Sequence, residues 1–357
     1  MRILHVCDSI IGGTGSYLAE LLTLQAQRRG PGKVMLLMPY EHREHVEPRL
    51  ADSGVEFRYF SRKSRVRGMV RLALAFLSVR REFRPDIVHG HTFGAGVVTR
   101  VLRFGRRPAT IFCPHGWAFD IEMPALARNA LIAIERLLAL RSEKIVLISE
   151  HEERRARAIG IAERRLALVP NGIAAAPPAI PAVPWADNRL KLLFVGRFDR
   201  QKGLDLLIEA IRPLADRVAL RIVGAPAVSS GYHPPALPHV DIRGWRDRDG
   251  VVAEMKACDM LVVPSRWEGF GLVAVEAMRV GKPVLAAAAG GLNDILDGGR
   301  YGITVPVNDP VALRAAIETL SADRLTALAE AGHARFHDRY TAQRMTDDLD
   351  RVYAGLA

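Results

Sequence analysis

Short apolar runs, each of the length of a buried strand, alternate with longer segments of helical character along the chain. In the first 170 residues, the strand-like runs are Ile3–Cys7, Lys33–Met38, Ile87–Val88, Ala109–Cys113 and Lys144–Ile148. The helix-like segments are Tyr17–Arg29, Met69–Phe83, Ala95–Phe104, Ala125–Arg141 and Glu150–Ile159. This alternation predicts an α/β fold with a doubly wound parallel sheet. Because such sheets bind ligands beyond the carboxyl ends of their strands, the residues that follow each strand are the candidates for function.

The alternation starts again after a segment rich in alanine and proline, residues 173–184, whose composition is typical of a linker. The strands predicted beyond it are Leu190–Val195, Ala219–Val223, Val240–Arg243 and Met260–Val263. The predicted helices are Gly203–Pro213, Asp249–Ala257, Leu272–Arg279, Ala312–Ala331 and Thr341–Tyr353. At 357 residues the chain is long enough for two domains, which we place at 1–182 and 183–339.

The cysteines and the N-terminus bear on the cellular compartment. Cys7, Cys113 and Cys258 are odd in number and lie in or beside apolar runs, which favours reduced, buried thiols over a disulfide framework or a zinc site. Met1 and Arg2 lead directly into the first strand, so no signal peptide is expected. No apolar run reaches the roughly 20 residues of a membrane span. We therefore expect a cytoplasmic protein that does not cross a bilayer.

The net charge of +11 arises in the N-terminal half of the chain, since residues 1–180 hold 28 Lys/Arg against 17 Asp/Glu and the remainder holds 22 of each. The densest basic cluster comprises Arg62, Lys63, Arg65, Arg67, Arg71, Arg80, Arg81 and Arg84. Residues 69–79 within it are apolar, and two interpretations stay open. The segment is either an interfacial helix that binds anionic lipid or a core helix with solvated basic flanks. Nucleic acid is not expected, because few aromatic residues lie between the charges and no binding motif is present.

The turn between the strand at 260–263 and the helix at 272–279 is the strongest candidate for a binding site. Gly269 and Gly271 allow unusual backbone angles and close approach of a ligand to the main chain. The free amides at the start of the helix attract anions, phosphate above all. This turn is therefore predicted to bind a phosphorylated ligand.

Two carboxylates flank the turn: Glu268 precedes the helix, and Glu276 lies about one helical turn inside it. The alternative interpretation is a capping glutamate and a solvated helix residue. The seven intervening residues, GFGLVAV, make the segment resemble the E-x7-E signature of retaining glycosyltransferases of the GT4 family.

Further motifs support this resemblance and occur in the family's order. They are the glycine-rich turn Gly12–Ser16, His115-Gly116, Pro170-Asn171-Gly172, Arg197 with Lys202, and Gly290-Gly291 with Asp294 where the family usually has Glu. The first turn follows a strand and opens a helix, so it could cradle phosphate, but it lacks the G-x-G-x-x-G dinucleotide fingerprint. Arg197 and Lys202 lie beside a helix start, where two cations would stabilise the charge of a departing diphosphate.

The resemblance covers nearly the whole chain and implies the GT-B fold, in which two Rossmann-like domains face each other across a cleft. It also implies that the C-terminal helix, within residues 340–357, crosses back to the N-terminal domain. The expected reaction transfers a sugar from a UDP- or GDP-sugar to a saccharide or lipid-linked acceptor, with retention of configuration, in bacterial cell-surface polysaccharide or glycolipid synthesis. The basic half suggests attachment to the inner face of the cytoplasmic membrane through residues 62–84. A nucleotide-sugar epimerase, a phosphorylase and a non-catalytic scaffold of the same fold are the alternatives.

The family's residue roles transfer to matching positions. The resemblance assigns catalysis to Glu268, His115, Arg197 and Lys202. It assigns nucleotide-sugar binding to Gly13, Arg197, Lys202, Gly244, Glu268, Gly269, Phe270, Gly271, Leu272 and Glu276. His91 and Gly15 are expected on the acceptor side. No metal or other cofactor is expected, because no D-x-D motif is placed for a metal and His89 and His91 have no acidic or thiol partner at ligand spacing.

Overall fold

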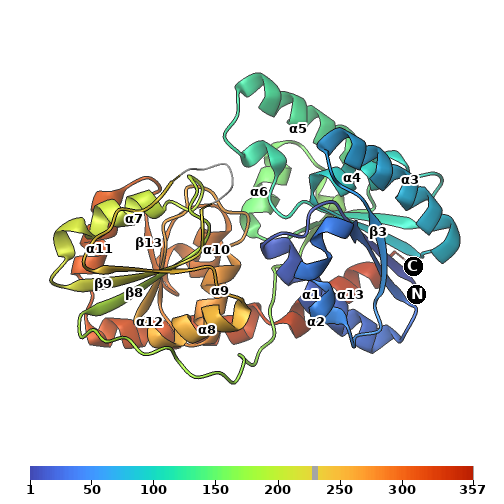
Figure 1. Ribbon diagram of the computed structural model, residues 1–357. Helices are drawn as coiled ribbons and strands as arrows, with labels where there is room; N and C mark the ends of the chain where they lie inside the picture. The colour runs from blue at the N-terminus through green and yellow to red at the C-terminus, as the bar shows by residue number, and fades with distance from the viewer. Residues whose placement is uncertain (227–231, 357) are drawn as a thin grey trace. The chain divides into compact units, whose positions relative to one another are not determined.

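The structure, a computed structural model, describes residues 1–226 and 232–356. It consists of two compact units. Unit 1 comprises Met1–Ala174 together with Thr341–Ala357, and unit 2 comprises Ala175–Tyr340. Each unit is a parallel sheet with helices on both faces, which confirms the predicted α/β class (Figure 1).

All but the first two residues of the linker belong to unit 2, so the units divide at 174/175 and 340/341 where the sequence suggested 182/183 and 339/340. Side chains of unit 2 bind the carbonyl oxygens of the linker. Arg221 donates to Val183 O and Pro184 O, and Lys256 Nζ lies 2.9 Å from both Pro178 O and Ile180 O. These contacts fasten a segment without regular secondary structure along the domain that follows it.

Unit 1 has a seven-stranded sheet in the order β3-β2-β1-β4-β5-β6-β7. The strands are β1 (Ile3–Cys7), β2 (Val34–Pro39), β3 (Glu56–Phe60), β4 (Ile87–His91), β5 (Ala109–Cys113), β6 (Lys144–Leu147) and β7 (Leu166–Leu168). The sequence did not predict β3 and β7. β3 reads EFRYF, without a continuous apolar run, and β7 has three residues; both are edge strands, which are buried less than central strands.

The helices of unit 1 are α1 (Gly13–Arg29), α2 (Glu47–Leu50), α3 (Arg65–Phe83), α4 (Thr92–Val101), α5 (Ala125–Ala139), α6 (Glu150–Ala158) and α13 (Ala342–Ala354). Short 3-10 helices occur at Tyr40–His45, Ala118–Asp120 and Glu163–Arg165. Helices α3, α4 and α5 cover one face of the sheet, and α1 and α13 cover the other (Figure 1). On α3, the buried residues Leu72, Phe76, Val79 and Phe83 pack against the strands.

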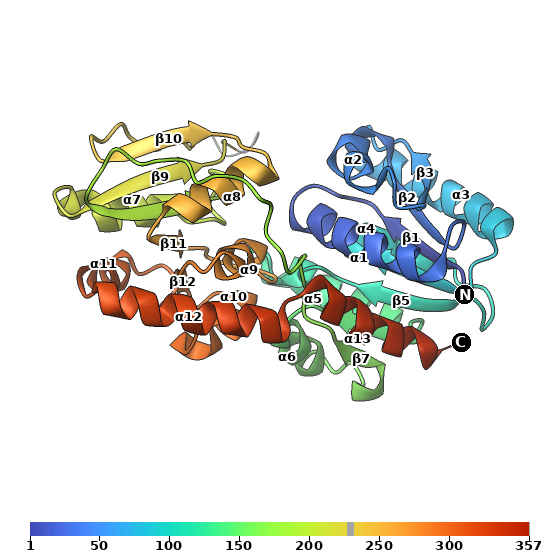
Figure 2. The ribbon, with the colours of Figure 1, turned by 90° about the horizontal axis from the view of Figure 1, so that it is seen from below.

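Unit 2 has a six-stranded sheet in the order β10-β9-β8-β11-β12-β13. Its strands are β8 (Leu190–Val195), β9 (Val218–Val223), β10 (Val240–Gly244), β11 (Met260–Val263), β12 (Val284–Ala287) and β13 (Ile303–Val305). Its helices are α7 (Leu204–Ile211), α8 (Arg248–Ala257), α9 (Leu272–Arg279), α10 (Gly291–Leu296), α11 (Pro310–Glu318) and α12 (Ala322–Arg339), with 3-10 turns at Arg212–Leu214 and Asp297–Gly299. Helices α7 and α11 lie on one face of this sheet, and α8, α9 and α12 lie on the other (Figures 1 and 2).

Three elements of unit 2, β12, β13 and α10, are short and were not predicted. The single helix expected at 312–331 is wrong, because the structure has two helices, α11 and α12, separated at residues 319–321. Ser321 is the N-cap of α12: its side chain accepts a hydrogen bond from Arg324 N at 3.3 Å. The apolar periodicity continues across residues 319–321 and therefore suggested one helix. The serine cap starts a second helix there.

The end of the chain returns to unit 1 and is fastened beside the Pro170-Asn171-Gly172 motif. Ala342 N donates to Ile173 O at 2.8 Å, and Arg344 Nη2 donates to Pro170 O at 2.7 Å. A Cβ on Gly172 would lie 2.2 Å from Thr341 O, so this position requires glycine. Farther along α13, Arg28 of α1 pairs with Asp347 and Asp350. Among the described residues, no helix has the length and apolarity to cross a membrane.

Candidate active site

The site in unit 2 lies where the strand order reverses, between β8 and β11. Arg266 N, in the loop after β11, donates to Gln201 O in the loop after β8, at 2.8 Å, and Gln201 Nε2 donates back to Trp267 O at 3.1 Å. Gly291 N, after β12, donates to Glu268 O at 3.3 Å. Three loops from the carboxyl ends of neighbouring strands are thus joined by hydrogen bonds, at the position where such sheets bind ligands.

Glycines permit the close approach of these loops. A Cβ on Gly203 would lie 2.1 Å from Pro264 O, and one on Gly290 would lie 1.9 Å from Glu268 O. Both glycines also have positive φ, at 66° and 54°. Gly290 and Gly291 were recognised from the sequence as a family motif, and their physical role is to bring the β12 loop against the backbone of Glu268.

The two predicted cations emerge from the loop after β8. Lys202 Nζ lies 2.6 Å from Glu268 Oε2, and both side chains are largely buried. Arg197 is about half exposed, with Nε 2.9 Å from Asp199 Oδ2, and Asp199 Oδ1 accepts a hydrogen bond from Lys202 N at 3.0 Å. Asp199 therefore orients both cations. Asp199 was not among the predicted site residues, although an aspartate three positions before Lys202 is typical of a turn.

The backbone at the start of α9 lies next to this ion pair. Gly271 is the N-cap, with φ 103° and ψ 53°. Ala274 N donates to Gly271 O at 3.0 Å, whereas the amides of Leu272 and Val273 lie too early in the helix to have an acceptor inside it. The ring of Phe270 is buried and contacts Tyr340 edge-on, so its side chain belongs to the core of unit 2. Leu272 and Glu276 are partly buried on the same helix. The structure thus brings together Arg197, Lys202, Glu268 and the residues from Gly269 to Leu272, whose binding roles stay predictions.

Two neighbouring positions complete this edge of unit 2. Gly244, at the end of β10, has φ 71°, and its carbonyl oxygen accepts a hydrogen bond from Gly224 N at 2.9 Å. Arg266 turns away from the amides of α9 and toward α7, where its guanidinium donates to both carboxylate oxygens of Asp205, at 2.8 and 2.6 Å. Arg266 is therefore a structural link between the loop after β11 and α7.

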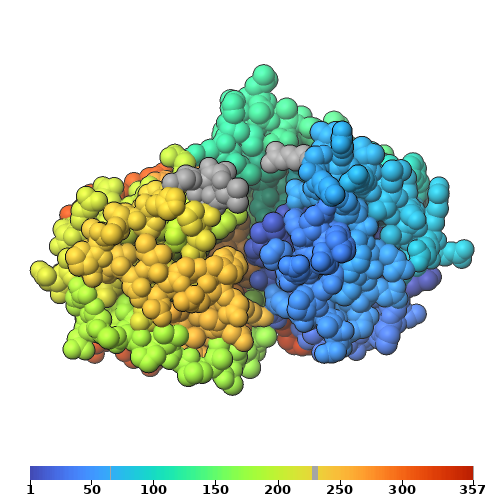
Figure 3. Space-filling model, in the orientation of Figure 1, coloured from blue at the N-terminus to red at the C-terminus, as the bar shows by residue number. Residues whose placement is uncertain are grey.

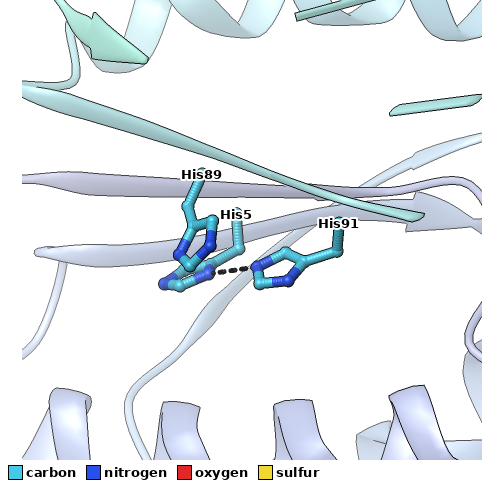
Figure 4. A group of neighbouring side chains, drawn as sticks. All are labelled: His5, His89 and His91. Atoms are coloured by element: carbon cyan, nitrogen blue, oxygen red, sulfur yellow. Dashed lines mark hydrogen bonds between the residues drawn. The ribbon is translucent and has the colours of Figure 1, made fainter. Parts of the chain in front are cut away.

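Histidines gather on one face of the sheet in unit 1. The register pairs His5 of β1 with His89 of β4, and alternation along β4 puts His91 on the same face as His89 (Figure 4). His5 Nδ1 lies 2.9 Å from His91 Nε2, and His91 Nδ1 lies 3.0 Å from His115 Nε2. His89 Nδ1 lies 2.7 Å from the hydroxyl of Tyr353 on α13. Parallel pairing in register thus joins residues that are distant in sequence.

Within the part of the chain that the structure describes, two groups have donor atoms close enough to hold a metal: His5 with His89 and His91, and His91 with Cys113 and His115. His5, Cys113 and His115 lie far from His89 and His91 in sequence, so spacing along the chain does not reveal them as partners. However, both ring nitrogens of His5 and of His91 lie within hydrogen-bond distance of other side chains. The cluster is thus connected by hydrogen bonds in the structure, and the expectation that it holds no metal stays a prediction.

The loop after β5 holds His115 in an unusual backbone conformation, with φ 52°. Gly116 N donates to Glu152 Oε1 at 2.6 Å, and burial raises the pKa of Glu152 to about 8. Burial lowers the pKa of His115 to about 3, so its imidazole is neutral at pH 7. Glu152, which the sequence analysis missed, thus positions the residue that follows His115.

The glycine-rich turn after β1 differs from its prediction, since α1 begins at Gly13 and not at Tyr17. A Cβ on Gly15 would lie 2.4 Å from Ile10 O, so close packing alone requires glycine at this position. The acceptor-side role expected for Gly15 stays a prediction. Gly13 is the first residue of α1. Gly15 N and Ser16 N donate to Gly12 O, so the amides without an acceptor inside the helix are those of Gly13 and Thr14.

The comparisons with known proteins agree with this geometry. Residues 12–172 match the family described as "Glycosyl transferase 4-like domain", and residues 189–323 match "Glycosyl transferases group 1". A Klebsiella pneumoniae protein described as an uncharacterized 41.2 kDa protein in the cps region is 30% identical over 325 residues, 87% of each chain. D-inositol 3-phosphate glycosyltransferase of Geodermatophilus obscurus is 31% identical over 311 residues, 76% of this chain and 67% of that protein.

Solved structures show the same fold. Anabaena HepE, in a complex with UDP-glucose, superposes with a TM-score of 0.82 at 19% identity over 99% of this chain and 100% of HepE. Sucrose-phosphate synthase from Thermosynechococcus elongatus gives 0.79 at 20% identity over 100% and 99% of the two chains. The fold and the site define a GT-B glycosyltransferase. The chain belongs to the group 1 glycosyltransferases, of the GT4 type, and the family that the sequence suggested is confirmed.

Proposed function

We propose that the protein transfers a sugar from a nucleotide-diphosphate donor bound by unit 2, with UDP-sugars as the first candidates. The observation that carries this proposal is the pairing of Lys202 with Glu268 beside the start of α9, where the amides of Leu272 and Val273 have no acceptor inside the helix. When the donor binds, its diphosphate pairs with Lys202 and a hydroxyl of its sugar donates to Glu268. Each residue thus exchanges its present partner for a ligand group of matching chemistry. The structures of HepE with UDP and with UDP-glucose support UDP as the nucleotide.

In this proposal, positive charge on unit 2 favours departure of the nucleotide. Arg197, Lys202 and the amides from Gly269 to Leu272 offset the charge that develops on the leaving phosphate, without a metal. Glu276 binds the ribose hydroxyls, and Glu268 binds hydroxyls of the donor sugar after Lys202 turns to the phosphate. Fixed charges of this kind accelerate transfer because they match the transition state better than the bound donor.

We further propose that transfer retains the anomeric configuration. The residues that flank the donor site offer hydroxyl-binding carboxylates and cations, and the family precedent is attack on the same face from which the nucleotide leaves. The acceptor oxygen bonds to the anomeric carbon on the face of the sugar from which the phosphate departs. The departing phosphate accepts the proton of the acceptor hydroxyl on that same face. The acceptor is proposed to be a saccharide or a lipid-linked saccharide of a bacterial cell surface, in line with structural similarity to the lipopolysaccharide galactosyltransferase WaaB (TM-score 0.68, 16% identity, 99% and 100% coverage).

A transfer assay tests this function. Purified protein is incubated with UDP-, GDP- and ADP-sugars, a panel of saccharide and lipid-linked acceptors, and a metal chelator, and the product is analysed by proton NMR. We expect acceptor-dependent nucleotide release from one donor, unaffected by chelation, and a product with the donor's anomeric configuration. Acceptor-independent turnover would instead show an epimerase or hydrolase, and an inverted product would contradict retention.

We propose that unit 1 docks on an anionic membrane through α3 and α5. Val66, Val70 and Leu74 recur every fourth residue on α3 and are 78%, 57% and 63% exposed. They form an apolar stripe on the face opposite the core, and the exposed Arg67 and Arg71 lie on the same helix. Charge complementarity to anionic headgroups and apolar contact with the acyl region are the two components of interfacial binding.

Not every arginine of the cluster is available for lipid. Arg80 donates to the carbonyl oxygens of Leu102, Phe104 and Arg107, which makes it structural. The side chain of Arg65 lies outside the described residues. The other face of this segment is buried, as the core-helix interpretation expects.

Helix α5, which the sequence analysis did not connect with a membrane, has the same character. Leu126, Leu137 and the C-cap Leu140 are 84%, 67% and 63% exposed, and Arg136 is exposed on the same helix. Both α3 and α5 contribute to the outer surface of unit 1 (Figure 3). The two helices together supply the apolar area that a single short stripe lacks.

We expect the protein to sediment with vesicles of phosphatidylglycerol and not with neutral phosphatidylcholine vesicles, and salt to weaken this binding. The double variant Val70→Glu/Leu74→Glu should reduce the partition coefficient by more than tenfold, because it adds negative charge and removes apolar contact. The matched control is Val311→Glu, which alters a comparably exposed valine on unit 2. Equal loss in both variants, or no binding by the wild type, would refute membrane docking.

A further inference from the structure

Four side chains of unit 1 form a continuous hydrogen-bonded chain that begins in the core and ends at the loop after β5. His5 Nε2 lies 2.8 Å from Gln25 Oε1, and His5 Nδ1 lies 2.9 Å from His91 Nε2. The chain continues from His91 Nδ1 to His115 Nε2 at 3.0 Å. Gln25, His5 and His91 are fully buried, whereas His115 is partly exposed.

The imidazoles of this chain are neutral at physiological pH. Burial lowers the pKa of His5 to about 4 and that of His115 to about 3, and it moves the pKa of His91 well below the ordinary value. A neutral imidazole carries one N–H and one lone pair. A chain of neutral histidines therefore has a direction, since each ring that donates through Nε2 must accept through Nδ1.

The direction is set by Gln25, at the buried end. Its Oε1 is an acceptor, so His5 must carry its proton on Nε2 and accept on Nδ1. His91 then donates from Nε2 to His5 and accepts on Nδ1, which requires His115 to donate from Nε2. The opposite orientation of the Gln25 amide would reverse all three tautomers, and the measurement below distinguishes the two.

The free end of the chain is Nδ1 of His115. Within residues 1–226 and 232–356, this nitrogen has no hydrogen-bond partner. With its proton on Nε2, His115 presents a lone pair at Nδ1. Such an atom binds a hydroxyl group that donates, and it rejects an acceptor such as a phosphate oxygen.

We propose that Gln25, His5 and His91 are positioning residues that hold His115 as the Nε2–H tautomer, so that His115 Nδ1 accepts a hydrogen bond from a sugar hydroxyl of the substrate. This inference rests on the proposed function for the nature of the substrate, but the tautomer itself does not depend on activity. It explains why a polar glutamine and two histidines occupy fully buried positions between β1, β4 and α1, where apolar residues would cost less to bury.

The tautomers are read directly by nitrogen-15 NMR of histidine side chains in labelled protein, with His5→Asn, His91→Asn and His115→Asn variants to assign the signals. We expect His5, His91 and His115 of the wild type to show protonated Nε2 and unprotonated Nδ1 between pH 6.5 and 8. Protonation of His115 on Nδ1 would overturn the proposal. Because this result needs no substrate, it separates failure of the proposal from failure of the proposed function.

Variants of Gln25 test the origin of the direction. Gln25→Leu removes the acceptor, so His115 should become a mixture of tautomers and kcat/KM should fall about tenfold, the effect of one hydrogen bond. Gln25→Glu keeps an acceptor oxygen and should restore both the Nε2–H tautomer and most of the activity. Gln27→Leu, at an exposed position of the same helix, is the control for hydrophobic substitution on α1.

An unchanged His115 tautomer in folded Gln25→Leu protein would contradict the role of Gln25. The same conclusion would follow if Gln25→Glu failed to restore a tautomer that Gln25→Leu had altered. If Gln25→Leu does not fold, the wild-type and Gln25→Glu spectra still decide the direction of the chain.

Discussion

We expect Lys202→Ala to lower kcat/KM for sugar transfer by about 10²–10³, the loss typical when one preorganised charge-stabilising group is removed. Lys202 Nζ lies 2.6 Å from Glu268 Oε2 at the proposed donor site of unit 2, and Asp199 closes the turn that carries this lysine. Its replacement removes a cation from the developing phosphate charge and leaves Glu268 without this partner. Initial-rate kinetics with the donor identified in the transfer assay measure the effect.

The control for loss of a positive charge is Lys33→Ala, at an exposed position of unit 1, which should leave kcat/KM within twofold of the wild type. Lys202→Arg keeps the charge but changes its geometry, so we expect partial recovery only. Thermal unfolding of each variant shows whether the domain is intact. A folded Lys202→Ala protein with kcat/KM within threefold of the wild type would contradict the role assigned to this lysine.

The second large effect is structural. Gly290→Ala should destabilise unit 2 by about 2–5 kcal/mol, because it combines backbone strain with overpacking. The new Cβ would lie 1.9 Å from Glu268 O in the present backbone, and Gly290 has φ 54° and ψ −128°. The loops after β11 and β12 must separate to accept it, which displaces Glu268. Urea unfolding and transfer kinetics should therefore both change.

Gly281→Ala is the matched control for this substitution. Gly281 also has positive φ, 67°, but a Cβ there would meet nothing within 4 Å. Its cost should be that of the backbone conformation alone, about 1 kcal/mol, with activity preserved. If both variants lost the same stability, close packing of the two loops would not be what requires glycine at position 290.

Much of the fold is predictable because buried parallel strands have a strong signature. Ile3–Cys7, Ala109–Cys113, Leu190–Val195 and Met260–Val263 were predicted with the bounds observed. The edge strand β10 was predicted, but the edge strands β3, β7 and β13 and the interior strand β12 were missed. β3 carries polar residues that interrupt the apolar run on which prediction depends, and the other three strands have only three or four residues. The break between α11 and α12 was missed because a capping serine is a local signal that periodicity does not contain.

The proposed donor site of unit 2 was predicted in outline because its residues lie close together in the sequence, in two short turns. Glu268 and the glycines beside it lie in one turn, and Arg197 and Lys202 lie in another, each between a strand and a helix. What sequence could not supply was how these turns meet. The Lys202–Glu268 pair and the contact of Gly290 with Glu268 depend on the lateral order of β8, β11 and β12.

The histidine chain illustrates the same limit in unit 1. His89 and His91 were evident as a pair, but His5 joins them through the parallel register of β1 with β4, and Gln25 joins through the packing of α1. Register and helix packing are tertiary properties, so a search for partners at short sequence spacing cannot find them. The available signal was His5, a polar residue inside a predicted buried strand, because such a residue requires a hydrogen-bond partner elsewhere in the core.

We propose that unit 2 binds a nucleotide sugar through the loops after β8 and β11. The most direct test of this proposal is thermal unfolding of the purified protein against UDP, GDP, ADP and their sugars, since a ligand that binds the native state raises the midpoint according to its affinity. We predict a shift with UDP and UDP-sugars that is lost in Arg197→Ala and Glu276→Ala and kept in Glu209→Ala, an exposed glutamate of α7. No shift with any nucleotide would contradict the account and favour a non-catalytic scaffold.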